Sequence, residues 1–288
     1  MGVHILENEY LKVTVADAGA ELSSVIDKAS GTERLWNADP IVWNRHAPIL
    51  FPFVGRVAGG EYRIDGKAYP MKTQHGFARD MDFTCTEKTE VSVTHCLTYT
   101  DSTLAVYPYK FRLTVTHAIE GRVLTVGWKV ENIGGELMYY SIGGHPGFML
   151  PVPKADCYVT FPNKTELEYF SVGGDGLALP DAKYNVKPDN SYVPIDSTLP
   201  DTWVFSHQGI DTVGLALPDK SPYVTMHCEG FPLLAVWAKE DGPFVCLEPW
   251  YGRTDDSGFT GTLADKPEVQ TLNAGDSKVM TYSVEFHG

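Results

Sequence analysis

Apolar and polar residues alternate with a period of two along much of this chain. In the segment LKVTVA, the side chains of Leu11, Val13 and Val15 fall on one face and the residues between them are polar. The segments at 91–99 and 111–119 repeat this pattern. A period of two is typical of a half-buried β-strand, because successive side chains of a strand point to opposite faces. We therefore predict strands at these positions.

More strands are predicted in the second half of the chain. One spans 123–131, and five shorter apolar segments between Trp203 and Glu248 are separated by turn residues: WVFSH, VGLAL, YVTMHC, LAVWA and FVCLE. No window of about twelve residues has the apolar stripe of an amphipathic helix, so a parallel sheet with crossover helices is disfavoured. The pattern predicts an all-β fold, a large antiparallel β-sandwich.

The chain is predicted to form a single domain over residues 1–288. No Pro/Ser-rich linker, charge block or fixed-period repeat divides it, and all-β single domains reach this length. The stretch at 171–195 is rich in Gly, Asp, Pro and Asn, which are turn formers. We predict that this stretch is a long surface loop.

The net charge narrows the choice of partners. The 288 residues include 23 Lys+Arg and 37 Asp+Glu, which gives a formal net charge of −14. Nucleic-acid binders depend on basic patches, so we expect no nucleic-acid partner. No stretch reaches the roughly 18 apolar residues of a membrane span, and the start, MGVHILENEY, lacks a signal-peptide pattern. We expect a cytoplasmic protein that does not bind membranes.

Cysteines and histidines give little indication of a metal site. The five cysteines are far apart and form no CxxC pair, which favours reduced thiols. The histidines form neither HxH nor HExxH, and the adjacent side chains of His95 and Cys96 should point to opposite faces of a strand. His95 and His117 are interpreted as core residues, and His4 and His287 lie near the termini. We expect no metal ion.

Four segments carry polar side chains in settings that a structural role alone does not explain. Three of them place a charged or titratable residue beside glycines, where the backbone can approach a ligand closely: PILFPFVGR (48–56), QHGFARD (74–80) and IGGHPGF (142–148). The fourth is CLEPWYG (246–252), in which a glutamate shares the buried face of an apolar strand.

Glu248 in the fourth segment must be paired or functional, because an isolated charge on a buried strand face is very costly. A structural salt bridge and an exposed edge position remain as alternatives, and we expect Pro249 to prevent the strand from continuing as a central one. Pro146 keeps the backbone of His145 extended. His75 is a further candidate, and a structural role stays open for both histidines.

Five segments in this order resemble the aldose 1-epimerase (galactose mutarotase-like) family, in particular its bacterial LacX-like branch: NEYLKVTVADAGAELSSV, PILFPFVGR, QHGFARDMDF, GGHPGF and CLEPWYG. The resemblance implies a β-sandwich of the large type. It also implies an isomerase without a cofactor that interconverts the α and β anomers of a free aldose. In that reaction Glu248 takes the proton of the anomeric hydroxyl and His145 protonates the ring oxygen.

The resemblance also implies substrate-binding roles. Arg56 matches the arginine that holds sugar hydroxyls, and His75 matches a second active-site histidine. Asp201, in LPDTWVF, is the candidate for an aspartate that binds hydroxyls. An aromatic floor would add apolar contact for the C–H face of the sugar. Three residues are candidates for this floor, with core packing as the alternative: Trp237, Phe148 and Trp250.

Ring opening explains why a carboxylate and an imidazole are needed. One proton leaves O1 while another reaches the ring oxygen. With ordinary pKa values of about 4.3 and about 6.5, Glu248 should be ionised, and a nearby negative charge should raise the pKa of His145 toward the working pH.

The substrate stays open. The sequence departs from galactose mutarotases, since Gly-His-Pro at 144–146 replaces Asn-His-aromatic and Glu-Pro-Trp at 248–250 replaces Glu-x-Gln. One alternative is a hexose-6-phosphate 1-epimerase, with Arg56, Lys72 and Arg79 as the candidate cations. Another is a non-catalytic carbohydrate-binding protein. The expected partner is a small sugar, and the chain is expected to be a monomer or a homodimer.

Overall fold

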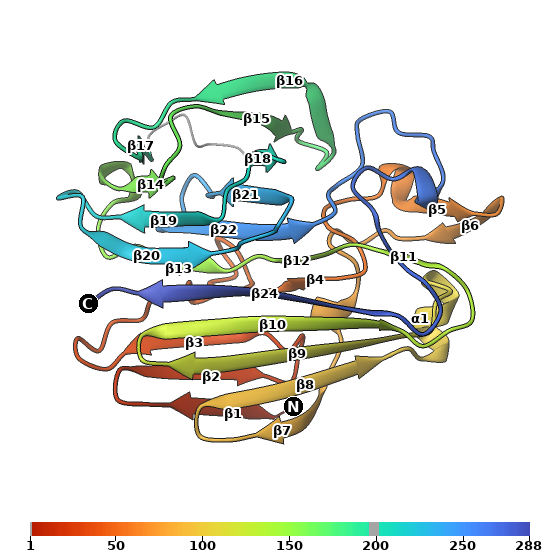
Figure 1. Cartoon of the computed structure of the whole chain (residues 1–288), viewed down its shortest axis with the longest axis horizontal. Coiled ribbons are helices and arrows are strands. Elements are labelled where there is room, and N and C mark those ends of the chain that lie inside the picture. The colour runs from red at the N-terminus through yellow and green to blue at the C-terminus, as the bar shows by residue number, and fades with distance from the viewer. Residues whose placement is uncertain (1, 196–201) are drawn as a thin grey trace.

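Antiparallel strands make up almost all of the regular structure (Figure 1), as the alternation of apolar and polar residues predicts. The computed structural model describes residues 2–195 and 202–288. Within these ranges the helices are short: α1 (Asp101–Val106) and the 3₁₀ helices Ala58–Gly60, Ala78–Asp80, Lys154–Asp156 and Leu263–Asp265. None of the described helices has the length and hydrophobicity to cross a membrane.

The largest sheet in the described part has nine strands in the order β17-β14-β19-β20-β24-β10-β9-β8-β7. In chain order these strands are β7 (Thr84–Lys88), β8 (Ser92–Thr98), β9 (Phe111–Glu120), β10 (Val123–Asn132), β14 (Tyr158–Thr160), β17 (Tyr192–Pro194), β19 (Thr212–Ala216), β20 (Pro222–His227) and β24 (Ser277–Phe286). The C-terminal strand β24 lies between β20 and β10 and therefore joins the two halves of this sheet (Figure 1).

The second large sheet, counted over the same described residues, has eight strands in the order β16-β15-β18-β21-β22-β12-β4, with β13 also pairing to β22. Its strands are β4 (Ile49–Leu50), β12 (Ile142–Gly144), β13 (Gly147–Met149), β15 (Leu167–Val172), β16 (Ala178–Val186), β18 (Trp203–Ser206), β21 (Leu233–Trp237) and β22 (Phe244–Tyr251). This sheet carries the candidate site.

Three small sheets complete the described strands. The N-terminal sheet has the order β1-β2-β3, and the other two are β5 with β6 and β11 with β23. Their bounds are β1 (Val3–Glu7), β2 (Leu11–Ala16), β3 (Leu22–Asp27), β5 (Glu61–Ile64), β6 (Lys67–Pro70), β11 (Met138–Tyr140) and β23 (Gln270–Leu272).

The nine-stranded sheet buries one of its faces. His95, Val115 and Trp128 stand in one row across β8, β9 and β10, and all three are buried. On the same face of the sheet, Phe286 of β24 contacts Phe148 of β13, with ring centroids 6.3 Å apart. The N-terminal sheet approaches this face at β8 and β9. The core thus lies between the nine-stranded sheet and two covering sheets, which is the predicted sandwich arrangement.

The predicted surface loop at 171–195 is wrong. Most of the segment is strand, since it holds the end of β15, all of β16 and β17. The glycines of Gly173-Gly174-Asp175-Gly176 form the turn between β15 and β16. The edge strand β16 is largely exposed, so its side chains are mostly polar and its sequence resembles a loop.

The expectation that Pro249 excludes a central strand is also wrong. β22 runs through Pro249 to Tyr251, in the interior of its sheet. On one side β22 pairs continuously with β21. On the other side it pairs with β13 up to Cys246 and with β12 from Trp250. Pro249 falls in the interval between these two ladders, where the absence of an N–H group is tolerated.

Candidate functional site

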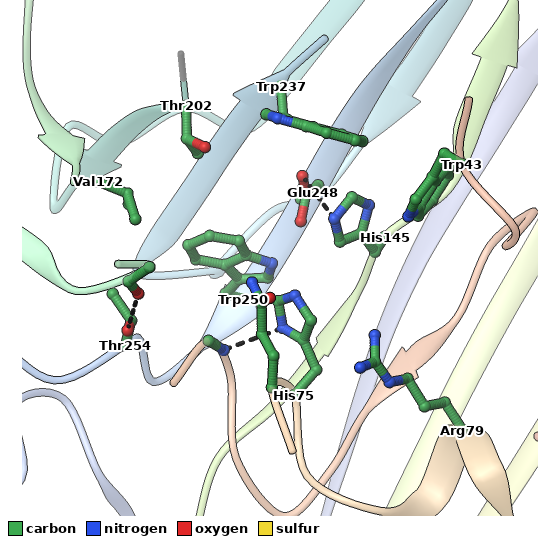
Figure 2. A pocket seen from close by; sticks show the side chains of 13 residues that line it. Trp43, His75, Arg79, His145, Val172, Thr202, Trp237, Glu248, Trp250 and Thr254 are labelled. Atoms are coloured by element: carbon green, nitrogen blue, oxygen red, sulfur yellow. Dashed lines mark hydrogen bonds and ion pairs between the residues drawn. The ribbon is translucent and has the colours of Figure 1, made fainter. Parts of the chain in front are cut away.

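A pocket of about 270 Å³ opens on the eight-stranded sheet, next to β22. Its polar and aromatic lining consists of Trp43, Gln74, His75, Arg79, His145, Thr202, Trp237, Glu248, Trp250 and Thr254. These residues come from distant parts of the chain and converge on one concave region (Figure 2). Of the four segments with unexplained polar residues, three contribute side chains here: those with His75, His145 and Glu248.

Glu248 stands in β22 on the face that it shares with Cys246 and Trp250. Its cross-strand partner on β21 is Ala235, whose small side chain leaves space beside the carboxyl. Glu248 is 1% exposed, so the edge position open to water does not apply. Its Oε2 atom has no hydrogen-bond partner within the described residues, which leaves that oxygen available to a ligand.

His145 lies between β12 and β13, where the strand path is interrupted by Pro146. Its Nε2 atom is 3.3 Å from Oε1 of Glu248, the contact drawn as a dashed line in Figure 2. His145 is buried, and its Nδ1 atom has no partner in the described part of the chain. The contact brings together the two residues that the resemblance assigns to acid and base.

Two glycines before His145 allow β12 to approach its neighbours. A Cβ atom on Gly143 would collide with the indole of Trp250, and one on Gly144 would lie 3.0 Å from the hydroxyl of Tyr282. Any larger residue would therefore push His145 or Trp250 away from its present place. The glycines of IGGHPGF thus have a packing role that supports the site.

The backbone of His75 has a φ of 67°, a left-handed conformation that favours glycine. Two hydrogen bonds with Gly55 hold His75 in place. Its N–H donates to the carbonyl of Gly55 (2.7 Å), and the N–H of Gly55 donates to Nδ1 of His75 (3.0 Å). Because Nδ1 accepts this bond, a neutral His75 carries its proton on Nε2. The ring lines the pocket and its centroid is 5.5 Å from that of the His145 ring.

Three tryptophans form the walls of the pocket (Figure 2). Trp43 and Trp237 contact the ring of His145, with centroids 4.9 Å and 5.5 Å away, and Trp250 faces the same space. Of the three predicted floor candidates, Trp237 and Trp250 line the pocket, whereas Phe148 is buried against Phe286. Trp43 was missed because its surroundings, IVWNRH, carry no pattern that distinguishes it.

Burial governs the charges of the central pair. It raises the pKa of Glu248 well above its ordinary value and lowers the pKa of His145 to about 3. The pKa of His75 also falls well below its usual value, first because of burial and then because of the neighbouring His145. The expectation of an ionised Glu248 and a raised pKa for His145 is therefore wrong here, since the uncharged forms are favoured in so dry a place.

The structure places the predicted arginine elsewhere. Arg56 is exposed and packs over Gly176, outside the pocket lining. Arg79, a candidate only for phosphate, lines the pocket instead. The periodicity of the sequence could not separate these two arginines, because each follows an apolar or glycine-containing segment and neither lies on a regular strand. Asp201 lies outside the described residues.

Two groups of side chains in the described part have donor atoms close enough to hold a metal ion. One is His145, Cys246 and Glu248, of which His145 and Glu248 line the pocket, and the other is His4, Cys85 and His95. In each group the donor atoms lie within 4.8 Å of one another. Motif spacing did not reveal either group. In the first, His145 lies far along the chain from Cys246 and Glu248 of β22, and in the second the three residues come from β1, β7 and β8.

Comparison with known proteins decides the family. The model of the family described as aldose 1-epimerase matches residues 3–186. The chain is also 30% identical to the chromosomal protein LacX of Lactococcus lactis subsp. lactis, over 97% of each chain. This chain belongs to the aldose 1-epimerase family. The predicted membership is confirmed, and LacX proteins are among the relatives of this chain.

Solved structures described as galactose mutarotase related or galactose mutarotase-like have the same fold. A galactose mutarotase related enzyme from Lactobacillus acidophilus superimposes with a TM-score of 0.93 at 31% identity, covering 100% of this chain and 98% of the other. A galactose mutarotase-like protein from Lactobacillus casei ATCC 334 gives a TM-score of 0.91 at 31% identity, covering 99% and 100%. These matches confirm the predicted fold class.

Proposed function

We propose that the protein interconverts the α and β anomers of a free aldose, with Glu248 as the base and His145 as the acid. The observation that carries this proposal is the 3.3 Å contact between Oε1 of Glu248 and Nε2 of His145 in a tryptophan-walled pocket. Membership of the aldose 1-epimerase family supports the same reaction. A hemiacetal ring needs one proton acceptor and one proton donor to open, and this pair supplies both.

The proton balance starts from the uncharged pair. Burial raises the pKa of Glu248 and so favours its protonated form, and sugar hydroxyls that bind both groups favour transfer of this proton to Nε2 of His145. The carboxylate then removes the proton of O1, the C1–O1 bond becomes a carbonyl, and the C1–O5 bond breaks as His145 protonates O5. Rotation about C1–C2 and reversal of both transfers closes the ring on the other face of the carbonyl.

Other lining residues position the sugar. The Nε2–H group of His75 and the guanidinium of Arg79 are donors for sugar hydroxyls. Trp43, Trp237 and Trp250 offer apolar faces for the C–H groups of the ring. These contacts hold C1 near the catalytic pair, and positioning of this kind accounts for much of an enzyme's rate.

The test is mutarotation followed by polarimetry with common free aldoses. Glu248→Gln should lower the catalysed rate by about 10²–10⁴-fold, because it removes the base. Glu285→Gln, on β24 outside the pocket, should keep the rate and serves as control. The proposal fails if the wild-type protein accelerates no common aldose. Tight sugar binding by calorimetry with an unchanged mutarotation rate would instead indicate a carbohydrate-binding protein.

A hexose 6-phosphate is the second candidate substrate, favoured by cations at one end of the pocket. Arg79 lines the pocket, and Arg56 and Lys72 line a separate hollow of about 300 Å³ together with Asp175. Arg56 packs against Gly176, which itself lines the pocket. A phosphate that extends from a bound sugar over Gly176 would meet Arg56, whereas a free aldose would make no use of this cation.

Exchange rates measured by NMR for glucose and glucose 6-phosphate separate the two substrates. A phosphate site predicts a preference for the phosphorylated sugar that the double variant Arg56→Gln, Lys72→Gln removes. The matched control is Lys67→Gln, an exposed lysine on β6. Equal rates for the two sugars would exclude a phosphate-specific site.

A further inference from the structure

A second group of chemically reactive side chains lies outside the pocket, where the N-terminal sheet meets the nine-stranded sheet. His4 comes from β1, Cys85 from β7 and His95 from β8. Their donor atoms lie within 4.8 Å of one another. A carboxylate joins them, because Oδ1 of Asp17 is 2.8 Å from Nε2 of His4 and 3.2 Å from Nε2 of His95. We call these four residues the N-terminal donor cluster.

We propose that the N-terminal donor cluster binds one divalent transition-metal ion of the zinc type. Two imidazoles, one thiolate and one carboxylate form a donor set that zinc takes in four-coordinate tetrahedral sites. With zinc–ligand distances of about 2.0–2.3 Å, ligand atoms in such a site are separated by about 3.3–3.8 Å. The donor atoms of His4, Cys85 and His95 lie within 4.8 Å of one another, and Oδ1 of Asp17 lies 2.8 Å and 3.2 Å from the two imidazoles. Side-chain shifts on the order of 1 Å would therefore complete the site.

The backbone holds the four residues in place before any ion binds. Cys85 and His95 are direct cross-strand partners in β7 and β8, so their side chains share one face. The N–H of Asp17 donates to Gly2 (3.0 Å), and the N–H of Phe83 donates to the carbonyl of Asp17 (2.8 Å). These bonds fix Asp17 between β1 and the start of β7, which places its carboxylate against both imidazoles.

Charge and access also fit a divalent ion. The carboxylate of Asp17 and a Cys85 thiolate would supply two negative charges, which balance the two positive charges of the ion. Asp17 has 22% of its side chain exposed and His4 has 17%, so an ion can enter from solvent. His95 is fully buried, and apart from Asp17 its ring has no polar partner in the described ranges.

The site would cross-link two sheets. β1 carries His4, and β7 and β8 of the nine-stranded sheet carry Cys85 and His95. These strands lie near one another in the lower part of the view in Figure 1, beside the point marked N. Because a metal bound only in the folded state stabilises that state, zinc should raise the melting temperature of the whole chain.

Titration of the chelator-treated protein with Co²⁺ tests the proposal. The wild-type chain should bind one ion, with visible d–d absorption and a near-ultraviolet thiolate-to-cobalt band. Cys85→Ser should abolish the thiolate band, and His4→Ala should weaken binding by more than about tenfold. Both lie at partly exposed positions, and both variants should lose the rise in melting temperature that Zn²⁺ gives to the wild type.

Two controls exclude other sites. Cys96→Ser changes the thiol next to His95, which points to the opposite face of β8, and it should bind as the wild type does. Cys246→Ser removes the thiol of the pocket group and should also leave the cobalt spectrum unchanged. The proposal is overturned if no stoichiometric binding occurs, if Cys85→Ser keeps the thiolate band, or if Cys246→Ser is the variant that loses it.

Discussion

At the scale of single residues, the central fact is a carboxyl group kept out of water. Glu248 is 1% exposed, and its Oε1 atom lies 3.3 Å from the imidazole Nε2 atom of His145. Such a group destabilises the fold whenever it is ionised, because burial penalises the charge. Glu248 therefore lowers the free energy of unfolding relative to an apolar residue at the same position.

This cost gives a pH-dependent prediction for Glu248→Gln. The pKa of Glu248 is raised in the folded state, so wild-type stability is lost as pH rises from the unfolded-state pKa toward the folded-state pKa. Gln cannot ionise, and its amide can donate to Nε2 of His145 as a protonated carboxyl would. The variant should melt higher than the wild type, by roughly 2–4 °C for each kcal/mol, with a gap that widens with pH.

Thermal unfolding followed by circular dichroism between about pH 5 and about pH 8 measures this gap. Glu285→Gln on β24 is the control, because its carboxyl is only half-buried. A gap that stays constant over this range, or that shrinks as pH rises, would show that Glu248 is not held in its uncharged form by the fold.

At the scale of elements, the site depends on a gap in the strand pairing along one side of β22. β12 and β13 pair with the two ends of β22 and leave a gap between them, and His145 occupies that gap opposite Glu248. A continuous neighbouring strand would cover the carboxyl with its own backbone. The close approach of β12 in turn requires glycine, since Gly143 lies directly against Trp250.

Gly143→Ala should therefore impair the site more than the fold. The added methyl group displaces Trp250 or β12, which we expect to lower stability by about 1–3 kcal/mol and the catalysed mutarotation rate by about 10²-fold, because small misplacements of reacting groups are costly. Gly135→Ala is the matched control, since a methyl group there meets no neighbour. Denaturant unfolding and polarimetry measure the two effects, and an unchanged rate in Gly143→Ala would contradict this role.

At the scale of the whole molecule, the last strand joins the early and late parts of the chain. β24 pairs with β10 on one side and with β20 on the other. Loss of β24 would expose a strand edge in each half of the nine-stranded sheet. It would also expose a row of buried side chains on β24 itself: Met280, Tyr282, Val284 and Phe286. This arrangement supports the prediction that residues 1–288 form a single domain.

A single cooperative unfolding transition is the expected consequence. Curves recorded by near-ultraviolet circular dichroism, tryptophan fluorescence and far-ultraviolet circular dichroism should coincide within error. Val284→Ala, in the buried row of β24, should move all three midpoints together, because it destabilises a strand that both halves share. Val279→Ala, at an exposed position of the same strand, should leave them in place. Separated midpoints would indicate two domains.

Sequence alone determined the fold class, because the period-two alternation of apolar side chains is a local consequence of burying one face of a strand. It also singled out Glu248, His145 and His75, since a polar residue amid apolar or glycine-rich neighbours is visible without coordinates. It misjudged 171–195 and Pro249, because the exposure of an edge strand and a gap between two ladders depend on which strands pair.

Only the tertiary structure decided which distant residues meet. It placed Trp43 and Arg79 in the pocket and Arg56 outside it, and it reversed the expected charges of the central pair through burial. It also brought His4 to His95, two residues with no sequence relation. Solvent exclusion and contact across strands are properties of the packed sheets, and the order of residues along the chain does not contain them directly.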